Sequence, residues 1–206
     1  MEYSEYLKLR EEVLAWVEPR IKPARFTHTL GVEQLAVTLA RIYSPEDYMS
    51  ASLAALLHDN AKNLPLDVQQ YLCDQHYPEM ELRREHSAVF HAFAGAAEAR
   101  RVFPQASEDI INAIAYHTTG RPGMSVLEKI IYCADYAEAN RDPFPELLEV
   151  RKVLRQDLDE GLRMILSGTG SYVRAKGKVV FPLTEETLQY YEKEKFSSKE
   201  ETAQST

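Results

Sequence analysis

The 206-residue chain has a hydrophobic fraction of 45% and a charged fraction of 27%, values typical of a globular protein with one domain. Its longest apolar stretches are too short to cross a bilayer, and its formal net charge of -8 disfavours nucleic-acid binding, which needs clustered lysine and arginine. Cys73 and Cys133 lack any paired spacing, which argues against a disulfide scaffold and against a thiolate zinc site.

Seven segments carry apolar residues every three or four positions, the pattern of helices buried on one side. They run from Tyr6 to Val17, Leu30 to Ile42, Tyr48 to Leu57, Val89 to Val102, Ile110 to Ala115, Val126 to Ala137 and Leu147 to Leu166. Pro23 lies between the first two segments, and Ser44 with Pro45 predicts an N-cap followed by proline at the first helical position. Gly120 follows the end of another helix. The pattern predicts an all-α fold.

The C-terminal part is predicted to hold one more helix, from Leu183 to Tyr191. The short apolar piece from Lys178 to Phe181 is too isolated to build a sheet, and we interpret it as an extended connector. Residues 192–206 are rich in polar and charged side chains, so we expect a disordered tail after a single domain over residues 1–191. The N-terminus shows no basic segment followed by an apolar one, which predicts no signal or transit peptide and a cytoplasmic location.

Imidazole and carboxylate side chains of the kind that bind divalent metals are spread over the predicted helices. The set consists of His28, His58, Asp59, His91, His117 and Asp135. His58 and Asp59 are about 100° apart at a helix end, so one metal placed there can accept both. If Asp59 bridges, His91 and His117 would hold a second ion about 3.5 to 4 Å from the first. Two such ions acidify a bridging water, which predicts a metal-dependent phosphate-cleaving enzyme.

Five motifs carry these ligand candidates: RFTHTLGV from Arg25, ALLHDNAK from Ala55, VFHAFAGA from Val89, YHTTGRPGMS from Tyr116 and EKIIYCADYAEANR from Glu128. They resemble the HD-domain family, specifically its bacterial branch called YqeK. The similarity runs from about Tyr6 to about Tyr191 and is specific, because other HD proteins share the ligands but not the stretch YHTTGRPGMS. Two positions depart from the pattern: Asn60 stands where a hydrophobic or aromatic residue is usual, and Ala139 where proline is common.

The resemblance implies a helical di-iron enzyme that hydrolyses diadenosine tetraphosphate symmetrically to two ADP molecules. It also implies that the six residues of the set are the ligands, although a lone histidine is more often a structural residue. Iron is the expected metal, and manganese or another transition metal would suit the same nitrogen and oxygen ligands. His86 competes with His91, but it lies about 140° away around the same predicted helix and family position favours His91. We expect His86 at a helix start or pocket rim and His76 in solvent.

A tetraphosphate needs positive charge and planar donors along its chain. The residues expected to meet it are Lys62, Thr118, Thr119, Gly120, Arg121 and Arg141. Lys62, one turn beyond His58, would hold a phosphate oxygen or protonate the departing ADP, and with Asp59 it forms the predicted catalytic pair. Arg25 lies one turn before His28 and is expected to orient a ligand or a carboxylate rather than to touch substrate. The competing interpretation of Lys62, Arg121 and Arg141 is that they are solvated surface charges.

Two other functions are open on the sequence alone. One is an HD phosphohydrolase that acts on another nucleotide, since the ligand set does not specify the substrate. The other is a non-catalytic binding module that keeps its metal for stability, because metal binding contributes folding free energy. A homodimer is a further possibility, with the helix that carries Trp16 as a candidate interface.

Overall fold

The computed structural model describes the backbone of residues 2–204 and the side chains of residues 2–193. This described part contains ten α-helices, four short 3-10 helices and no strand, which confirms the all-α prediction. The α-helices are α1 (Tyr3–Val17), α2 (Pro23–Tyr43), α3 (Tyr48–Leu57), α4 (Leu66–His76), α5 (Phe90–Val102), α6 (Glu108–Tyr116), α7 (Val126–Ala137), α8 (Pro145–Val153), α9 (Leu158–Ala175) and α10 (Pro182–Gln204). The 3-10 helices are η1 (Glu18–Arg20), η2 (Pro45–Asp47), η3 (Pro78–Met80) and η4 (Arg84–Val89).

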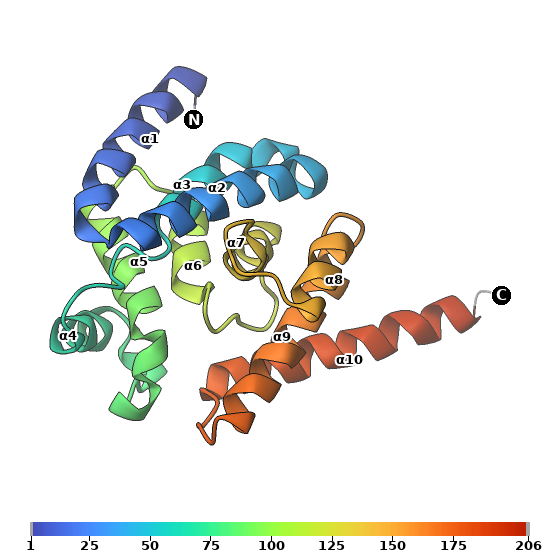
Figure 1. Cartoon of the computed structure of the whole chain (residues 1–206). Coiled ribbons are helices and arrows are strands. Elements are labelled where there is room, and N and C mark those ends of the chain that lie inside the picture. Colours follow the sequence, from blue (N-terminus) through green and yellow to red (C-terminus); the bar gives the residue numbers. More distant parts are fainter. Residues whose placement is uncertain (1, 205–206) are drawn as a thin grey trace.

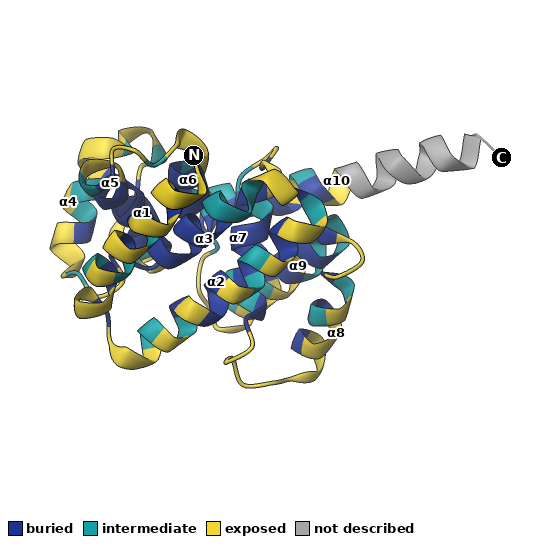
Figure 2. Ribbon diagram, turned by 90° about the horizontal axis from the view of Figure 1, so that it is seen from above, coloured by how far each residue is buried: buried dark blue, intermediate teal, exposed yellow. Residues whose placement is uncertain are grey.

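Helix α3 lies at the centre of the fold, in contact with α1, α2, α6 and α7 (Figure 1). Its residues from Ala51 to Leu57 are all buried, so the second half of the helix is covered on every side. Around it, α2 packs against α7, and α5 packs against both α4 and α6. Figure 2 shows the buried residues gathered in these inner helices, while α4 and α8 expose much of their surface. The chain that follows Leu57 therefore begins inside the protein.

Two parts of the helix prediction differ from the structure. Helix α4 lies where the pattern predicts no helix, because Gln69 and Cys73 are its only buried residues and leave no apolar stripe to detect. The single helix predicted from Leu147 to Leu166 is divided into α8 and α9. The division occurs because the side chain of Asp157 accepts a hydrogen bond from the backbone N–H of Glu160, which caps a new helix start.

The C-terminal connection from Lys178 to Phe181 is not a strand and joins α9 to α10, as predicted. Helix α10 continues to Gln204, whereas the sequence predicts a tail without structure from Glu192. The side chains after Lys193 lie outside the described residues, so the division of the chain at residue 191 and the tail over 192–206 stay predictions.

Within the described residues, no helix has both the length and the apolar character needed to cross a bilayer. Cys73 and Cys133 are both buried and free, and they pack as small hydrophobic residues. Trp16 packs edge-on against Phe103, with ring centroids 5.4 Å apart, and the guanidinium of Arg20 lies over its ring. Trp16 thus contributes to the packing of this protomer, and the homodimer stays a prediction.

Candidate metal centre

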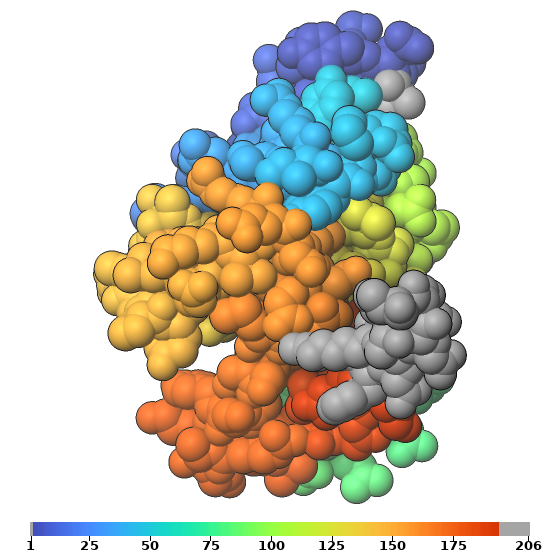
Figure 3. Space-filling model, turned by 90° about the vertical axis from the view of Figure 1, so that its right-hand side faces the viewer, coloured from blue at the N-terminus to red at the C-terminus, as the bar shows by residue number. Residues whose placement is uncertain are grey.

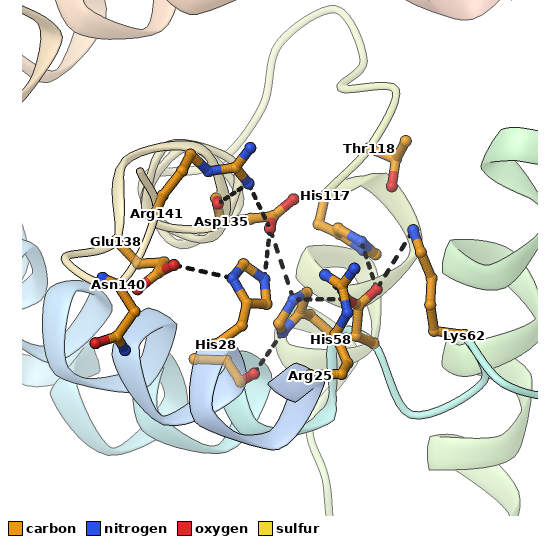
Figure 4. Close-up of polar contacts among 12 residues, drawn as sticks. Arg25, His28, His58, Lys62, His117, Thr118, Asp135, Glu138, Asn140 and Arg141 are labelled. Atoms are coloured by element: carbon orange, nitrogen blue, oxygen red, sulfur yellow. Dashed lines mark hydrogen bonds and ion pairs between the residues drawn. The ribbon is translucent and has the colours of Figure 1, made fainter. Parts of the chain in front are cut away.

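Five helices bring the six predicted ligands to one place. His28 comes from α2, His58 and Asp59 from the turn that follows α3, His91 from α5, His117 from the turn after α6, and Asp135 from α7. Figure 4 shows four of them, His28, His58, His117 and Asp135, with their side chains pointing toward one another. Because α3 ends in the interior, the side chain of His58 is 0% exposed. The tertiary packing therefore gathers the whole set.

The first group of ligand atoms belongs to His28, His58 and Asp135, which lie within 4.8 Å of one another. His28 Nε2 is 3.0 Å from Asp135 Oδ1, and His58 Nε2 is 3.8 Å from the same oxygen. Both Nε2 atoms are buried, and neither has an aligned hydrogen-bond partner among the described residues. Buried nitrogens without a partner, beside a carboxylate, are the donor set that a divalent cation requires.

The second group contains His58, Asp59 and His117, again within 4.8 Å of one another. His91 adjoins this group, with its Nε2 3.3 Å from His117 Nε2 and 3.4 Å from Asp59 Oδ1. His117 Nε2 is 3.8 Å from the same Asp59 oxygen. The Nε2 atoms of His91 and His117 thus both lie near Oδ1 of Asp59.

Asp59 presents its two oxygens to different groups of ligands. Its Oδ1 faces His91 and His117, whereas its Oδ2 lies 3.4 Å from His58 Nε2. Arg25 Nη1 donates a hydrogen bond of 2.9 Å to Oδ2, as expected for a residue that orients a carboxylate. A carboxylate held in this way is suited to bridge two cations.

Backbone carbonyls fix the tautomers of two histidines. His58 Nδ1 lies 2.6 Å from Ala55 O, and His117 Nδ1 lies 2.7 Å from Ile114 O. A carbonyl oxygen only accepts, so each Nδ1 carries the proton. Each Nε2 then directs its lone pair into the site, which is the arrangement of a metal-binding histidine.

Burial and neighbouring charges shift the pKa values of several of the ligands. Burial, with the charges of Lys62 and His117, holds the pKa of His91 well below its usual value. Burial also lowers the pKa of His117 to about 4. Burial alone would raise the pKa of Asp59, but neighbouring positive charges, that of His58 first and that of Lys62 among the others, lower that pKa well below its usual value. Burial lowers the pKa of His58, but the negative charges of Asp59 and Asp135 outweigh burial and raise it. At neutral pH His91 and His117 are therefore neutral imidazoles beside an ionised carboxylate, which suits a divalent cation.

Glu138 is a functional residue that the ligand pattern does not reveal. Its Oε1 lies 3.2 Å from His28 Nδ1, on the side of the ring opposite Asp135. The side chain of Glu138 is 2% exposed, and its Oε2 accepts a hydrogen bond of 2.6 Å from the backbone N–H of Asn140. A Cβ at Gly31 would overlap Glu138 Oε2, so the bare backbone of α2 makes room for this carboxylate. Glu138 thus orients the His28 ring, and its sequence signal is a carboxylate immediately after the helix that carries a ligand.

The unusual residue Asn60 ties the end of α3 to α5. Its Nδ2 donates to Leu57 O at 2.7 Å and to Gly95 O at 2.9 Å, and the side chain is buried. These two hydrogen bonds fix the turn that carries Asp59 relative to the helix that carries His91. Asn60, although it departs from the family pattern, therefore helps to hold Asp59 and His91 in place.

Three of the predicted substrate-binding residues lie at the ligand cluster. Lys62 Nζ is 3.0 Å from His91 Nε2 and 3.8 Å from Asp59 Oδ1, so a positive charge lies among the ligand atoms. Thr118 Oγ1 is 3.2 Å from His91 Nε2. Arg141 Nη2 donates to the backbone oxygen of Asp135 at 2.9 Å and lies 3.8 Å from its Oδ1. Polar groups thus flank the cluster from the three segments that follow α3, α6 and α7 (Figure 4).

The other three predicted substrate-binding residues make contacts with their own surroundings. Arg121 Nε and Nη2 donate to the buried carboxylate of Glu128, at 2.6 and 3.0 Å. Thr119 Oγ1 donates to Gly120 O, and Gly120 has a positive φ of 63° that favours glycine. These contacts shape the turn between α6 and α7, and they do not join it to the ligand atoms.

The two remaining histidines lie outside the cluster. His76 is the last residue of α4 and is exposed, as expected for a solvated histidine. His86 lies in η4, where its φ of -100° and ψ of 18° break the helical path. It therefore does not share the axis of α5 with His91, and the angle of 140° predicted from one continuous helix is wrong.

Comparison with known proteins identifies the family. A family model described as "HD domain" matches residues 25–140. A protein of Bacillus subtilis (strain 168) named "Bis(5'-nucleosyl)-tetraphosphatase, symmetrical" is 39% identical over 175 residues, which cover 85% of this chain and 93% of that protein. A Staphylococcus aureus protein of the same name is 30% identical, with 88% and 93% covered.

The solved structures include a similar fold. The crystal structure of a "predicted HD superfamily hydrolase involved in NAD metabolism" from Clostridium acetobutylicum matches with a TM-score of 0.81 and 37% identity. The match covers 89% of this chain and 97% of that one. The helical architecture, the convergent histidines and aspartates, and these matches together show that the chain belongs to the HD domain family.

Proposed function

We propose that this protein is a metal-dependent hydrolase that cleaves diadenosine tetraphosphate symmetrically into two ADP molecules. The observation that carries the proposal is the position of Asp59, whose oxygens face two different groups of histidines. The names of the relatives, which share 30–39% of their residues with this chain over most of its length, support the substrate.

The metal site is proposed to hold two divalent ions. One ion would be held by His28, His58 and Asp135. The other would be held by His91 and His117, and Asp59 would contact both ions. When bound, such ions supply a water acidified toward neutral pH and neutralise the oxygens of the phosphoryl group under attack. Iron is the expected metal, and manganese would suit the same ligands.

The chain's own cations would bind and orient the polyphosphate. Lys62 is the proposed residue that holds a phosphate oxygen or protonates the departing ADP, because its ammonium lies beside Asp59 and His91. Arg141 and Thr118 would contact phosphate from the two flanking loops. Glu128 engages Nε and Nη2 of Arg121, so a phosphate would have to meet this guanidinium through Nη1.

Thr119 and Gly120 are proposed to shape the turn that presents Thr118 and Arg121 to substrate. The hydroxyl of Thr119 is bonded to its neighbour, so the contribution of this pair is the conformation of the backbone. A cytoplasmic location and a homodimer are further proposals that accompany this function, and we expect no nucleic-acid partner.

The proposal is tested by elemental analysis of the purified protein together with chromatography of the products from diadenosine tetraphosphate. We expect two metal ions per chain and two ADP molecules per substrate consumed. Asp59→Asn should lose both metal and activity, while Asp67→Asn, at an exposed position in the first turn of α4, should keep both.

Two results would contradict the proposal. If the products were AMP and ATP, the cleavage would be asymmetric. If Asp59→Ala lowered the melting temperature but left phosphate hydrolysis unchanged, the metal would be a structural part of a binding module.

A further inference from the structure

The segment 138–141, which follows α7, contacts one side of the ligand cluster. Glu138 Oε1 lies 3.2 Å from His28 Nδ1, and Arg141 Nη2 donates to the backbone oxygen of Asp135 at 2.9 Å. Figure 4 shows Glu138 and Arg141 beside these two ligands. His28 and Asp135 both belong to the first ligand group, so the segment supports one of the two groups.

The segment has few apolar side chains to hold it in place. Residues 139–146 are all exposed, whereas Glu138 is buried. Asn140 Nδ2 donates to Thr27 O at 3.2 Å, which links the segment to α2. An exposed backbone without buried apolar contacts opens easily, so the position of Glu138 depends on hydrogen bonds to the segment.

Arg151, in α8, supplies hydrogen bonds to both ends of this segment. Its Nε donates to Ala137 O at 2.9 Å, and its Nη2 donates to Glu138 O and, at 3.4 Å, to Arg141 O. Ala137 is the last residue of α7, where the helix leaves carbonyl oxygens without a partner of its own. A guanidinium at this position also suits the negative end of the helix dipole.

Helix α8 gives Arg151 a fixed base. Leu147 and Val150 are buried on its inner face, and α8 packs against α9 and α7. After its end, Leu154 O accepts a hydrogen bond of 3.0 Å from Tyr43 Oη, the last residue of α2. Figure 3 shows this face of the molecule, where orange atoms of the α8 region lie next to light-blue atoms of α2. The donors of Arg151 are therefore fixed relative to the helix that carries His28.

We propose that Arg151 is a positioning residue for the metal ion of the first ligand group, an inference that rests on the two-ion centre of the proposed function. Arg151 holds the backbone of segment 138–141, and this backbone holds the Glu138 carboxylate behind the His28 ring. The second ligand group takes His91 from α5 and His117 from the turn after α6. Its ion should therefore be insensitive to Arg151.

The test measures Mn²⁺ affinity for each ligand group separately, by competition with a chelator. His91→Ala leaves the first group complete, and His28→Ala leaves the second group complete while it removes the ring that Glu138 orients. Arg151→Met keeps an apolar stem and removes the donors. Added to His91→Ala, it should weaken Mn²⁺ binding by about tenfold, and added to His28→Ala it should change nothing.

Two further variants separate geometry from charge. Arg151→Lys keeps the positive charge, but one ammonium lacks the planar fork that meets several carbonyls at once, so it should restore only part of the affinity. Arg155→Met removes the same charge from an exposed position in the turn after α8 and should leave Mn²⁺ affinity unchanged. Thermal melting of each metal-free variant by circular dichroism measures any general loss of stability.

The outcomes distinguish positioning from a purely structural role. Equal losses of Mn²⁺ affinity in the two backgrounds, or no loss in either, would overturn the inference. Full recovery in Arg151→Lys would assign the effect to charge alone and would also overturn it. A partial loss in Arg151→Lys, confined to the His91→Ala background, would support the inference even if Arg151→Met did not fold.

The affinity measurements are made without substrate, so they separate this inference from the proposed function. If the unchanged protein bound two Mn²⁺ ions but failed to cleave diadenosine tetraphosphate, the proposed function would fail. A selective effect of Arg151→Met on the first ligand group would still stand in that case.

Discussion

Gly31→Ala should weaken metal binding without adding or removing a polar group. The new Cβ would overlap Glu138 Oε2 and lie 2.7 Å from Asn140 Nδ2. The Glu138 carboxylate is buried and is held by the backbone N–H of Asn140, so it must give up its contact with His28 Nδ1. Loss of a residue that orients a metal-binding histidine lowers metal affinity by about 10- to 100-fold.

The effect of this substitution on stability should be smaller than its effect on metal binding. Alanine is favoured over glycine in a helix by about 1 kcal/mol, and overpacking costs about 1–3 kcal/mol. These opposing contributions predict a net loss of about 0–2 kcal/mol in the free energy of unfolding of the metal-free protein. A tight chelator in competition would measure the metal affinity, and thermal melting by circular dichroism would measure the stability.

Gly168→Ala is the matched control, because it makes the same change inside a helix without a close contact. The nearest atom to a Cβ there is Tyr136 Oη, at 4.0 Å, and the position is exposed on α9. This variant should keep full metal affinity and gain up to about 1 kcal/mol. If Gly31→Ala bound metal as tightly as Gly168→Ala, the proposed role of Glu138 would be wrong.

Three further predictions concern other contacts. Ser52→Ala should lower the free energy of unfolding by about 1–3 kcal/mol, because the buried Ser52 hydroxyl donates to Glu33 Oε1 at 2.6 Å and the substitution leaves this oxygen without that donor. Chemical denaturation measures the change, and an unchanged denaturation midpoint would refute the prediction. Burial raises the pKa of Cys73 to about 12 and also raises that of Cys133, so a disulfide reagent at pH 8 should titrate no thiol in the native protein and both in denaturant. Lys62→Met should lower kcat by about 10²- to 10⁴-fold while the metal content is kept; loss of metal with unchanged specific activity per metal would contradict a role in substrate chemistry.

Much of the helical fold is predictable from the sequence, because apolar periodicity records which face of each helix is buried. The segment from Tyr48 to Leu57 matches α3, and that from Val126 to Ala137 matches α7. Helix α4 is not predictable in this way, because it is exposed on most sides. The break before Asp157 is not predictable either, because the apolar pattern continues across it and only a capping hydrogen bond marks the start of the new helix.

The candidate ligands are also readable in the sequence, since imidazole and carboxylate are the groups that bind divalent metals and the motifs around them are specific. Their chemical identity is local information. Sequence patterns cannot give the partners of these residues, because such contacts join helices that are distant along the chain.

Tertiary packing alone decides what each side chain meets. It places Glu138 behind His28 through the space left by Gly31, and it commits two nitrogens of Arg121 to Glu128. It also turns the two oxygens of Asp59 toward different histidines. The sequence therefore determined which groups are available for metal and phosphate chemistry, while the packing of α2, α3, α5, α6 and α7 determined their geometry, because distances between side chains are set by helices that meet only in the folded protein.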